Sequence, residues 1–303
     1  MSIDGILNVN KPADMTSFQV VSIVRQWSGE KRVGHAGTLD PFATGVLPVC
    51  LGQGTRVAEF LAEAHKVYRA EVELGISTDT YDPSGRVVEQ HDASAVTEEQ
   101  VEKAIASFRG SILQVPPMYS ALKRGGKRLY QMARAGVEVP REARSIELFR
   151  LELLDWQPPL FTMEVECSKG TYIRSLAHDI GQVLGCGSHL RSLVRTKNGP
   201  FSLDDSIDVF DLEEAFVYGY WHDLIYPLDS VLLHWKAAIL GQESERVLRQ
   251  GQSLPVKGED DVSGDRCRAY SLDGRIFALL RWDSATGLWH PEKVFRNGQL
   301  SSA

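Results

Sequence analysis

The stretch VGHAGTLDPFATGVLPVCLGQGTR (residues 33–56) contains five glycines and a single carboxylate, Asp40. Pro41 follows Asp40, and a proline disfavours the helical conformation for the residue before it. We therefore expect Asp40 on a loop, where Gly37 and Gly45 would let a ligand or another backbone segment approach closely. A carboxylate in such a place can act as a nucleophile, a general base or a metal ligand. The structural alternative is an aspartate that caps a turn.

The whole chain has the composition of an ordinary globular protein. It has 303 residues, of which 43% are hydrophobic and 24% charged, and this length allows one large or two modest domains. There is no run of about 18 apolar residues, so no membrane-spanning helix is expected. The first residues contain an early acid and no basic segment before an apolar core. We therefore expect no signal peptide and a cytoplasmic protein.

The spacing of potential ligand residues does not indicate a metal site. The four cysteines are scattered, without a Cys-x-x-Cys pair, so we expect buried free thiols rather than disulfides or zinc ligands. No second carboxylate stands at ligand spacing near Asp40, and His35 is alone. The sequence therefore predicts no metal.

Charge is distributed unevenly along the chain. The net charge is −7, yet residues 119–200 carry 13 Lys and Arg against 8 Asp and Glu, whereas residues 201–303 carry 10 against 17. A basic middle third suits contact with a polyanion, although a chance fluctuation of surface charge explains it equally.

Within this basic third, the stretch 116–136 interleaves tyrosines with four cations: Lys123, Arg124, Lys127 and Arg128. Such a pattern is typical of a surface that follows a nucleic-acid backbone and stacks bases, and also of a solvated loop. Further along, Arg174 falls in the first turns of an expected helix, where it can pair with a carboxylate or a phosphate.

Hydrophobic periodicity predicts both helices and strands. We expect amphipathic helices over residues 16–29, 97–110 and 171–185, each ending at a glycine. We expect strands over residues 4–12, 66–75, 145–156 and 160–170, and several short ones from about residue 240 onward. The prediction is a mixed α+β protein with a small β-rich domain of roughly 60–65 residues at its C-terminal end.

Five segments, in this order, resemble the tRNA pseudouridine synthase B (TruB) family. They are GILNVNKPADMTS (5–17), GHAGTLDPFATGVLPVCLGQGTR (34–56), KVYRAEVELGISTDTYDPSG (66–85), VPPMYSALKRGGKRLYQMARAG (115–136) and CSKGTYIRSLAHDIGQVLGCGSHLRSLVRTKNGPF (167–201). The resemblance is much weaker over residues 201–303. It implies a pseudouridine synthase catalytic domain with a mixed, mainly antiparallel sheet over residues 1–235. A small β-rich, PUA-like RNA-binding domain is expected over residues 236–303.

The resemblance also implies a reaction. Asp40 matches the family's essential aspartate, which attacks a uridine covalently, at C6 of the base or at C1′ of the sugar. The base is then detached, turned and rejoined through carbon, without metal or cofactor. The expected substrate is uridine 55 in the T loop of tRNA, which must be flipped out of the folded arm before a side chain can reach it.

Further residues take their expected roles from the same resemblance. Tyr68 would stack on the flipped base, and Arg174 would pair with Asp40 to keep it ionised. The remaining matches are Leu193, which would pack on the base, His35, which would occupy space vacated in the T loop, Lys11 with Pro12, which would form a turn near the site, and Asp82, an acid near it.

The implied enzyme acts alone on a T-arm stem-loop, as a monomer, without a guide RNA or protein partner, and has tRNA folding chaperone activity as a second role. Two alternatives stay open. A non-catalytic RNA-binding protein would have no need of Asp40, Tyr68 and Arg174 together. A carboxylate-dependent hydrolase or glycosidase would need a second carboxylate as its acid or base.

Overall fold

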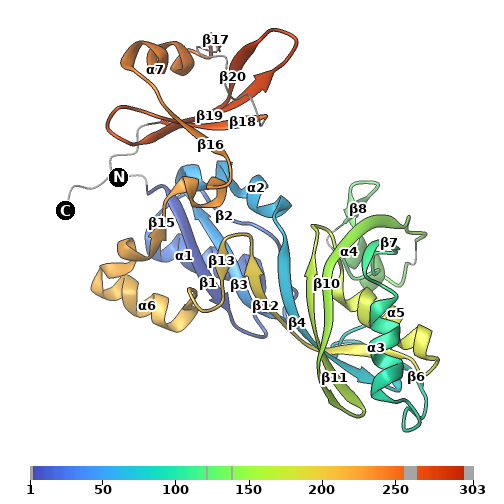
Figure 1. Ribbon diagram of the computed structural model, residues 1–303. Helices are drawn as coiled ribbons and strands as arrows, with labels where there is room; N and C mark the ends of the chain where they lie inside the picture. Colours follow the sequence, from blue (N-terminus) through green and yellow to red (C-terminus); the bar gives the residue numbers. More distant parts are fainter. Residues whose placement is uncertain (1–2, 121, 138, 256–264, 297–303) are drawn as a thin grey trace.

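The computed structural model describes residues 3–120, 122–137, 139–255 and 265–296. Within these residues, eleven strands form one large sheet that crosses the molecule (Figure 1). They are β1 Gly5–Lys11, β2 Val33–His35, β3 Thr44–Leu51, β4 Lys66–Leu74, β7 Gly110–Gln114, β10 Arg144–Gln157, β11 Leu160–Cys167, β12 Ser188–Asn198, β13 Phe201–Ser202, β14 Ile207–Asp208 and β15 Ile225–Tyr226. The main path runs β14-β1-β3-β12-β4-β11-β10-β7, with β2, β13 and β15 paired to β3, β12 and β1.

The pairing within this sheet is mainly antiparallel. Only the β1–β14 and β3–β12 pairs, among those described, are parallel. The predicted mixed, mainly antiparallel sheet is therefore confirmed. The alternation predicted for β4 also holds, because Tyr68, Ala70, Val72 and Leu74 are buried while Arg69 is exposed.

Helices cover the sheet and link its strands. The α-helices are α1 Ser17–Ser28, α2 Ala58–Glu63, α3 Glu98–Ala106, α4 Leu129–Arg134, α5 Ile173–Leu184, α6 Val209–Tyr218 and α7 Gln242–Arg249, and the short 3₁₀ helices are η1 Gly52–Arg56, η2 Tyr220–Leu224 and η3 Leu228–Leu232. In α1, Thr16 and Gln19 form a reciprocal capping box, and Gly29 ends the helix at a φ of 66°. The predicted helix, with its end at Gly29, is therefore confirmed, and the capping box explains why it begins after Thr16. In the described part of the chain, no helix has the length and apolarity needed to cross a membrane.

The predicted end of α3 is wrong. The helix begins after the Thr97 cap as expected, but it ends at Ala106 rather than at Gly110. The next residues continue in tighter turns, with Phe108 donating to the Ile105 carbonyl at 3.1 Å and Arg109 to that of Ala106 at 3.4 Å. Gly110 instead begins β7, where its φ of 89° lets the chain change direction.

Strand β12 holds the centre of the sheet together. It pairs in parallel with β3 and antiparallel with β4, so Arg195 lies opposite Gly45 on one side and Tyr68 on the other. Because the loop that carries Asp40 leads directly into β3, this order places that loop, β4 and the middle of β12 side by side. Two short strands, β5 Ile76–Thr78 and β6 Val87–Gln90, hold the loop that carries Asp82.

The last strands form a separate five-stranded sheet in the order β16-β18-β19-β20-β17 (Figure 1). They are β16 Lys236–Ile239, β17 Leu254–Pro255, β18 Arg266–Tyr270, β19 Ile276–Asp283 and β20 Leu288–Val294, so the strands predicted late in the chain are confirmed. The two sheets share one hydrophobic cluster, in which Leu279 and Phe295 pack with Ile6, Cys50 and Leu61. The small sheet is thus attached to the large one by a core rather than by a linker alone.

The sequence prediction for the cysteines is confirmed. Cys50, Cys167, Cys186 and Cys267 are all free and buried. They act as small apolar core residues.

Candidate active site

The loop that carries Asp40 lies between β2 and β3, as the sequence predicted, and is fixed on both sides of the aspartate. On one side, the Leu39 amide donates to the Ser17 hydroxyl at 2.9 Å, and this hydroxyl donates to the Leu39 carbonyl at 3.1 Å. On the other side, the ammonium of Lys11 donates to the Pro41 carbonyl at 3.0 Å. Asp40 is therefore presented on a backbone whose neighbours cannot move freely.

Lys11 is a buried lysine at the end of β1. Its ammonium also donates to the carbonyls of Pro12 at 2.7 Å and Met15 at 2.5 Å, so all three of its N–H groups are used. Burial lowers the pKa of Lys11 to about 8, while the negative charge of Asp40 opposes this shift. The structure therefore places Lys11 at the site as an anchor of the loop.

Arg174 holds Asp40 with two parallel contacts. Its Nε lies 2.9 Å from Oδ2 of Asp40, and its Nη2 donates to Oδ1 at 3.2 Å. The arginine side chain is 4% exposed, whereas that of Asp40 is 34% exposed. Such bidentate pairing fixes both the position and the direction of a carboxylate. The aspartate is thus bound from the protein side and open toward solvent.

The charge state of Asp40 follows from competing effects. Burial raises its pKa, the positive charge of Arg174 lowers it, the charge of Asp82 raises it and that of Lys11 lowers it. The net direction is upward from the ordinary value. The two cations therefore oppose, without cancelling, the rise in the pKa of Asp40 that burial and Asp82 cause.

Asp82 supports Arg174 from the opposite side. Its Oδ2 accepts from Nη1 of Arg174 at 3.0 Å, and both side chains are 4% exposed. Its Oδ1 accepts from the hydroxyls of Thr80 at 2.7 Å and Ser84 at 2.5 Å and from the Ser84 amide at 3.0 Å. Asp82 therefore acts through Arg174 and has no free oxygen facing the solvent side of the site.

Two carbonyls complete the surroundings of the arginine. Nη2 of Arg174 donates to the Tyr119 carbonyl at 2.8 Å, and Nη1 donates to the Thr80 carbonyl at 3.3 Å. The guanidinium thus joins the Asp40 loop, the Asp82 loop and the segment that carries Tyr119. One side chain on α5 fixes three separate parts of the chain.

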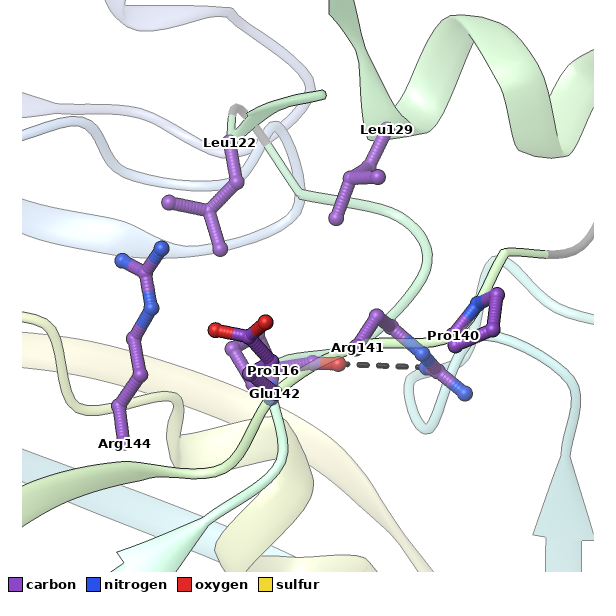
Figure 2. A pocket seen from close by; sticks show the side chains of 7 residues that line it. All are labelled: Pro116, Leu122, Leu129, Pro140, Arg141, Glu142 and Arg144. Carbon is purple, nitrogen blue, oxygen red and sulfur yellow. Dashed lines mark hydrogen bonds between the residues drawn. The ribbon is translucent and has the colours of Figure 1, made fainter. Parts of the chain in front are cut away.

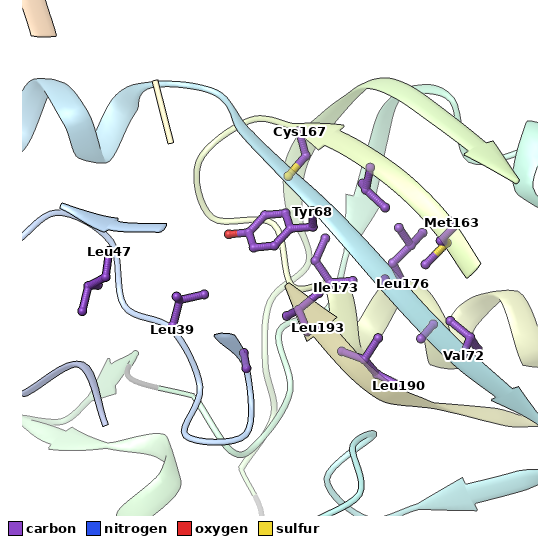
Figure 3. Packing of buried hydrophobic residues seen from close by; sticks show 14 of the residues in the cluster. Leu39, Leu47, Tyr68, Val72, Met163, Cys167, Ile173, Leu176, Leu190 and Leu193 are labelled. Atoms are coloured by element: carbon purple, nitrogen blue, oxygen red, sulfur yellow. The ribbon is translucent and has the colours of Figure 1, made fainter. Parts of the chain in front are cut away.

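Tyr68 and Leu193 form an apolar wall next to this polar cluster. Tyr68 comes from β4 and Leu193 from β12, and both belong to the main hydrophobic core, with exposed fractions of 9% and 6%. Figure 3 shows the Tyr68 hydroxyl directed toward the segment that carries Leu39, with Leu193 and Ile173 beside the ring. Burial raises the pKa of Tyr68, so the phenol is neutral at ordinary pH.

His35 lies on β2, paired with Val49 of β3. Its Nδ1 is buried and has no hydrogen-bond partner among the described residues. Burial lowers the pKa of His35, and the nearby charge of Arg195 lowers it further. The imidazole is therefore neutral and has no described hydrogen bond to Asp40.

The four cations of the predicted RNA-contacting stretch lie on a β-hairpin. Lys123 and Arg124 form β8, which pairs with β9, formed by Lys127 and Arg128. Their side chains lie outside the described part of the structure, so only the backbone prediction can be compared. Beside this hairpin, a cavity of about 200 Å³ is lined by Pro116, Leu122, Leu129, Pro140, Arg141, Glu142 and Arg144 (Figure 2). It does not include Asp40.

Two residues near the site were not assigned a role from the sequence. Tyr172 precedes α5, and its backbone N–H and C=O both bond to the side-chain amide of Gln114, at 2.8 and 3.0 Å. Its position two residues before Arg174 was the available signal. The other residue is Arg195, which is buried on β12; nothing in a strand sequence distinguishes a buried arginine from an exposed one.

The arrangement allows covalent chemistry by one carboxylate. Asp40 is accessible and held by a cation, and an apolar wall with an aromatic ring stands beside it. Asp82 is enclosed and committed to Arg174, so it is poorly placed to serve as the second acid or base of a glycosidase. The described residues contain no cluster of three or more His, Cys, Asp and Glu side chains able to hold a metal.

The fold is similar to that of chains in two solved structures. The crystal structure of a Cbf5-Nop10-Gar1 complex matches with a TM-score of 0.74 and 28% identity, over 96% of this chain and 85% of that one. The structure of an H/ACA RNP bound to a substrate RNA containing 2′-deoxyuridine matches with a TM-score of 0.73 and 26% identity, over 97% and 85% of the two chains.

Family models and curated relatives then define the family. The model "TruB family pseudouridylate synthase (N terminal domain)" matches residues 25–173, and "tRNA pseudouridylate synthase B C-terminal domain" matches residues 174–233. Proteins called tRNA pseudouridine synthase B are 43% identical in Dehalococcoides mccartyi, over 97% of both chains, and 45% identical in Clostridium tetani, over 89% of this chain and 91% of that one. The chain belongs to the TruB family of pseudouridylate synthases, and the resemblance drawn from its five segments is confirmed.

Proposed function

We propose that this chain converts uridine 55 in the T loop of tRNA into pseudouridine, with Asp40 as the covalent catalyst. The relatives named tRNA pseudouridine synthase B support the substrate class. The observation that carries the residue assignment is the bidentate pair between the accessible Asp40 and the buried Arg174. This pair supports Asp40 as the nucleophile, because it holds an accessible carboxylate in a fixed direction on the loop of the family's most specific segment.

The reaction is an isomerisation, so the product has the same atomic composition as the substrate. The bond between C1′ of ribose and N1 of uracil breaks, and a bond between C1′ and C5 forms. The hydrogen on C5 leaves as a proton, and N1 gains one. Attack by Asp40 at C1′ or at C6 gives the same balance, and no metal or cofactor is required.

Each side chain has a role that suits its surroundings. Tyr68 and Leu193 offer a flat ring and an aliphatic face, which suit a uracil flipped out of its stack. Arg174 keeps Asp40 ionised and aimed, and Asp82 holds Arg174. Neutral His35 would occupy space vacated in the T loop, and Lys11 anchors the loop of the nucleophile.

The RNA would contact two further parts of the chain. The hairpin of β8 and β9 brings four cations to a segment tied to the site through the Tyr119 carbonyl, and cations suit contact with a phosphate backbone. We propose that residues 1–235 form the catalytic domain and residues 236–303 a small PUA-like domain that contacts RNA. The acidic balance of residues 201–303 suits recognition of RNA shape more than strong charge attraction.

We further propose that the protein works alone as a cytoplasmic monomer. The solved structures to which this chain is similar include a complex that contains Nop10 and Gar1.

The test is release of tritium from a T-arm stem-loop labelled at uridine C5. Wild-type protein should release tritium in multiple turnovers, because the C5 hydrogen must leave when carbon joins the sugar. Asp40→Asn should release none while binding the same RNA. Asp155→Asn is the matched control, since Asp155 is an exposed aspartate on β10, and it should act like the wild type.

No release by folded wild-type protein that binds the RNA would contradict the proposed function. Release by Asp40→Asn at the wild-type rate would keep the activity and remove Asp40 from its role. A tRNA refolding assay with Asp40→Asn tests the second proposed role, chaperoning, because opening the T loop to reach the base does not require the covalent step.

A further inference from the structure

Arg195 is a buried arginine whose partners are not acids. It is 1% exposed and is among the largest fully buried side chains of the described protein. None of the ion pairs found between described residues includes it. Burying a charged group without a compensating charge is costly, so the fold must gain something specific from this guanidinium.

The guanidinium joins the two ends of the Asp40 loop. Its Nε donates to the Val46 carbonyl at 2.7 Å, and its Nη2 donates to the Gly37 carbonyl at 3.0 Å. Gly37 precedes Asp40 by three residues and Val46 follows it by six, so both ends of the loop are tied to one side chain. Next to it on β12, Asn198 donates to the Ala36 carbonyl at 2.8 Å.

The same side chain reaches Tyr68. Arg195 lies opposite Tyr68 in the β4–β12 pairing, and its positive charge is close enough to the phenol to oppose the rise in the pKa of Tyr68 that burial causes. Because the donors of a guanidinium lie in one plane in fixed directions, they hold the Asp40 loop at a set distance from the strand position that faces Tyr68. The register of the β4–β12 pairing shifts just after Arg195. Such an irregularity changes the direction of the side chains in this part of β12.

A glycine at position 37 fits this close approach. Its φ is 90°, and a Cβ placed there would lie 3.3 Å from Nη1 of Arg195. A Cβ at Gly45 would lie 2.2 Å from the Arg195 carbonyl oxygen. Two glycines of the stretch 33–56 are thus needed to let the loop lie against Arg195.

We propose that Arg195 is a positioning residue that couples the Asp40 loop to Tyr68, so that nucleophile and aromatic ring meet the flipped uracil in one fixed geometry. The proposal rests on the proposed function, because it assigns Asp40 and Tyr68 to the same substrate. The hydrogen bonds described for Arg195 go to the Val46 and Gly37 carbonyls and not to the Asp40 carboxylate. Its contribution is distinct from that of Arg174, which sets the charge of Asp40 directly.

The test compares Arg195→Lys and Arg195→Met with Arg191→Met. Arg191 is on the same strand but half exposed, and it pairs with Glu71 and Glu73 at 3.1 and 2.9 Å. For each protein, kcat and KM for tritium release are measured over pH, together with urea unfolding. Methionine resembles the aliphatic part of arginine and removes every donor, whereas lysine keeps the charge but carries it on a single nitrogen in place of the planar guanidinium.

We expect folded Arg195→Met to lose kcat by about 100-fold with KM changed less than about threefold, since misplacement of reacting groups by about 1 Å has effects of this size. Arg195→Lys should recover part of the loss. The acid limb of the pH–rate profile should stay at the wild-type pH, because Arg195 is not among the groups that shift the pKa of Asp40. Arg191→Met should match the wild type.

Three results would overturn the proposal. One is wild-type kcat in folded Arg195→Lys and Arg195→Met. Another is a loss of activity that only follows the unfolded fraction in the urea experiment, which would make Arg195 a stability residue. The third is a shift of the acid limb of the pH–rate profile while the maximal kcat stays at the wild-type value. Failure of the wild type to release tritium would instead contradict the proposed function.

Discussion

Replacing Asp82 by asparagine separates the two effects that Asp82 exerts on the site. The substitution keeps the shape of the side chain, and its carbonyl oxygen can still accept from Thr80 and Ser84. Its amide, however, turns a donor toward Nη1 of Arg174, where the carboxylate now accepts at 3.0 Å. Arg174 loses a charged partner in a place where both side chains are 4% exposed.

The magnitude follows from this burial. Removing one partner of a buried ion pair costs about 3–5 kcal/mol, and the retained hydrogen bonds to Thr80 and Ser84 place Asp82→Asn near about 3 kcal/mol. Because Asp40 depends on Arg174 for its direction, kcat should fall by about 100-fold, with a smaller change in KM. Urea unfolding and tritium release from the T-arm stem-loop measure the two quantities.

Asp82→Asn should also shift the pH dependence of kcat in a defined direction. The charge of Asp82 raises the pKa of Asp40, so its removal lowers that pKa. The acid limb of kcat, where Asp40 becomes protonated, should therefore move to lower pH even as the plateau falls. Asp79→Asn is the control, because Asp79 lies on the same loop and pairs with Arg86, which is 91% exposed. Wild-type stability and kcat in folded Asp82→Asn would refute this reasoning.

Three further changes test other parts of the structure. Arg174→Met removes the main charge that lowers the pKa of Asp40, so the acid limb of kcat should move to higher pH, and an unmoved limb in tritium-release profiles would contradict the assigned pairing. Gly45→Ala places a Cβ at a φ of 103° and 2.2 Å from the Arg195 carbonyl oxygen; it should cost about 3 kcal/mol in urea unfolding, whereas Gly136→Ala, with open space around it, should cost less. Gln53→Ala removes two bonds of 2.7 Å to the backbone of Arg296; it should cost about 2 kcal/mol and loosen the segment after β20, as hydrogen exchange of that segment would show.

Local sequence signals were sufficient for most of the fold. The capping boxes at Thr16 and Thr97 and the left-handed glycines at 29 and 185 act within a few residues, so their helices could be placed in advance. Alternation in β4 likewise reports burial on one face. The end of α3 was misplaced because Gly110 serves a strand, and a glycine that ends a helix looks the same in sequence as one that begins a strand.

Long-range contacts could not be obtained in this way. The pairing of Arg174 with Asp40 joins residues 134 positions apart, and that of Arg195 with Gly37 joins residues 158 positions apart. Periodicity and capping carry no information at such separations. The resemblance to a family supplied the first pair, but the burial of Arg195 is decided by the order of β3, β12 and β4, which only the structure gives.

Arg174 and Arg195 both position Asp40, by different contacts. The geometry of these contacts explains why each residue is an arginine. Arg174 must contact Asp40, Asp82 and two carbonyls at once, and Arg195 must bridge two carbonyls at the two ends of the Asp40 loop. A lysine ammonium is a single centre and cannot bond partners spread along a plane in this way. Arg174 approaches the loop from α5 and Arg195 from β12, so Asp40 is fixed from two independent elements. Loss of either element should therefore impair catalysis while leaving the other contact in place, and the double variant of Arg174→Met with Arg195→Met should lose little more kcat than the worse single variant if both serve the same geometry.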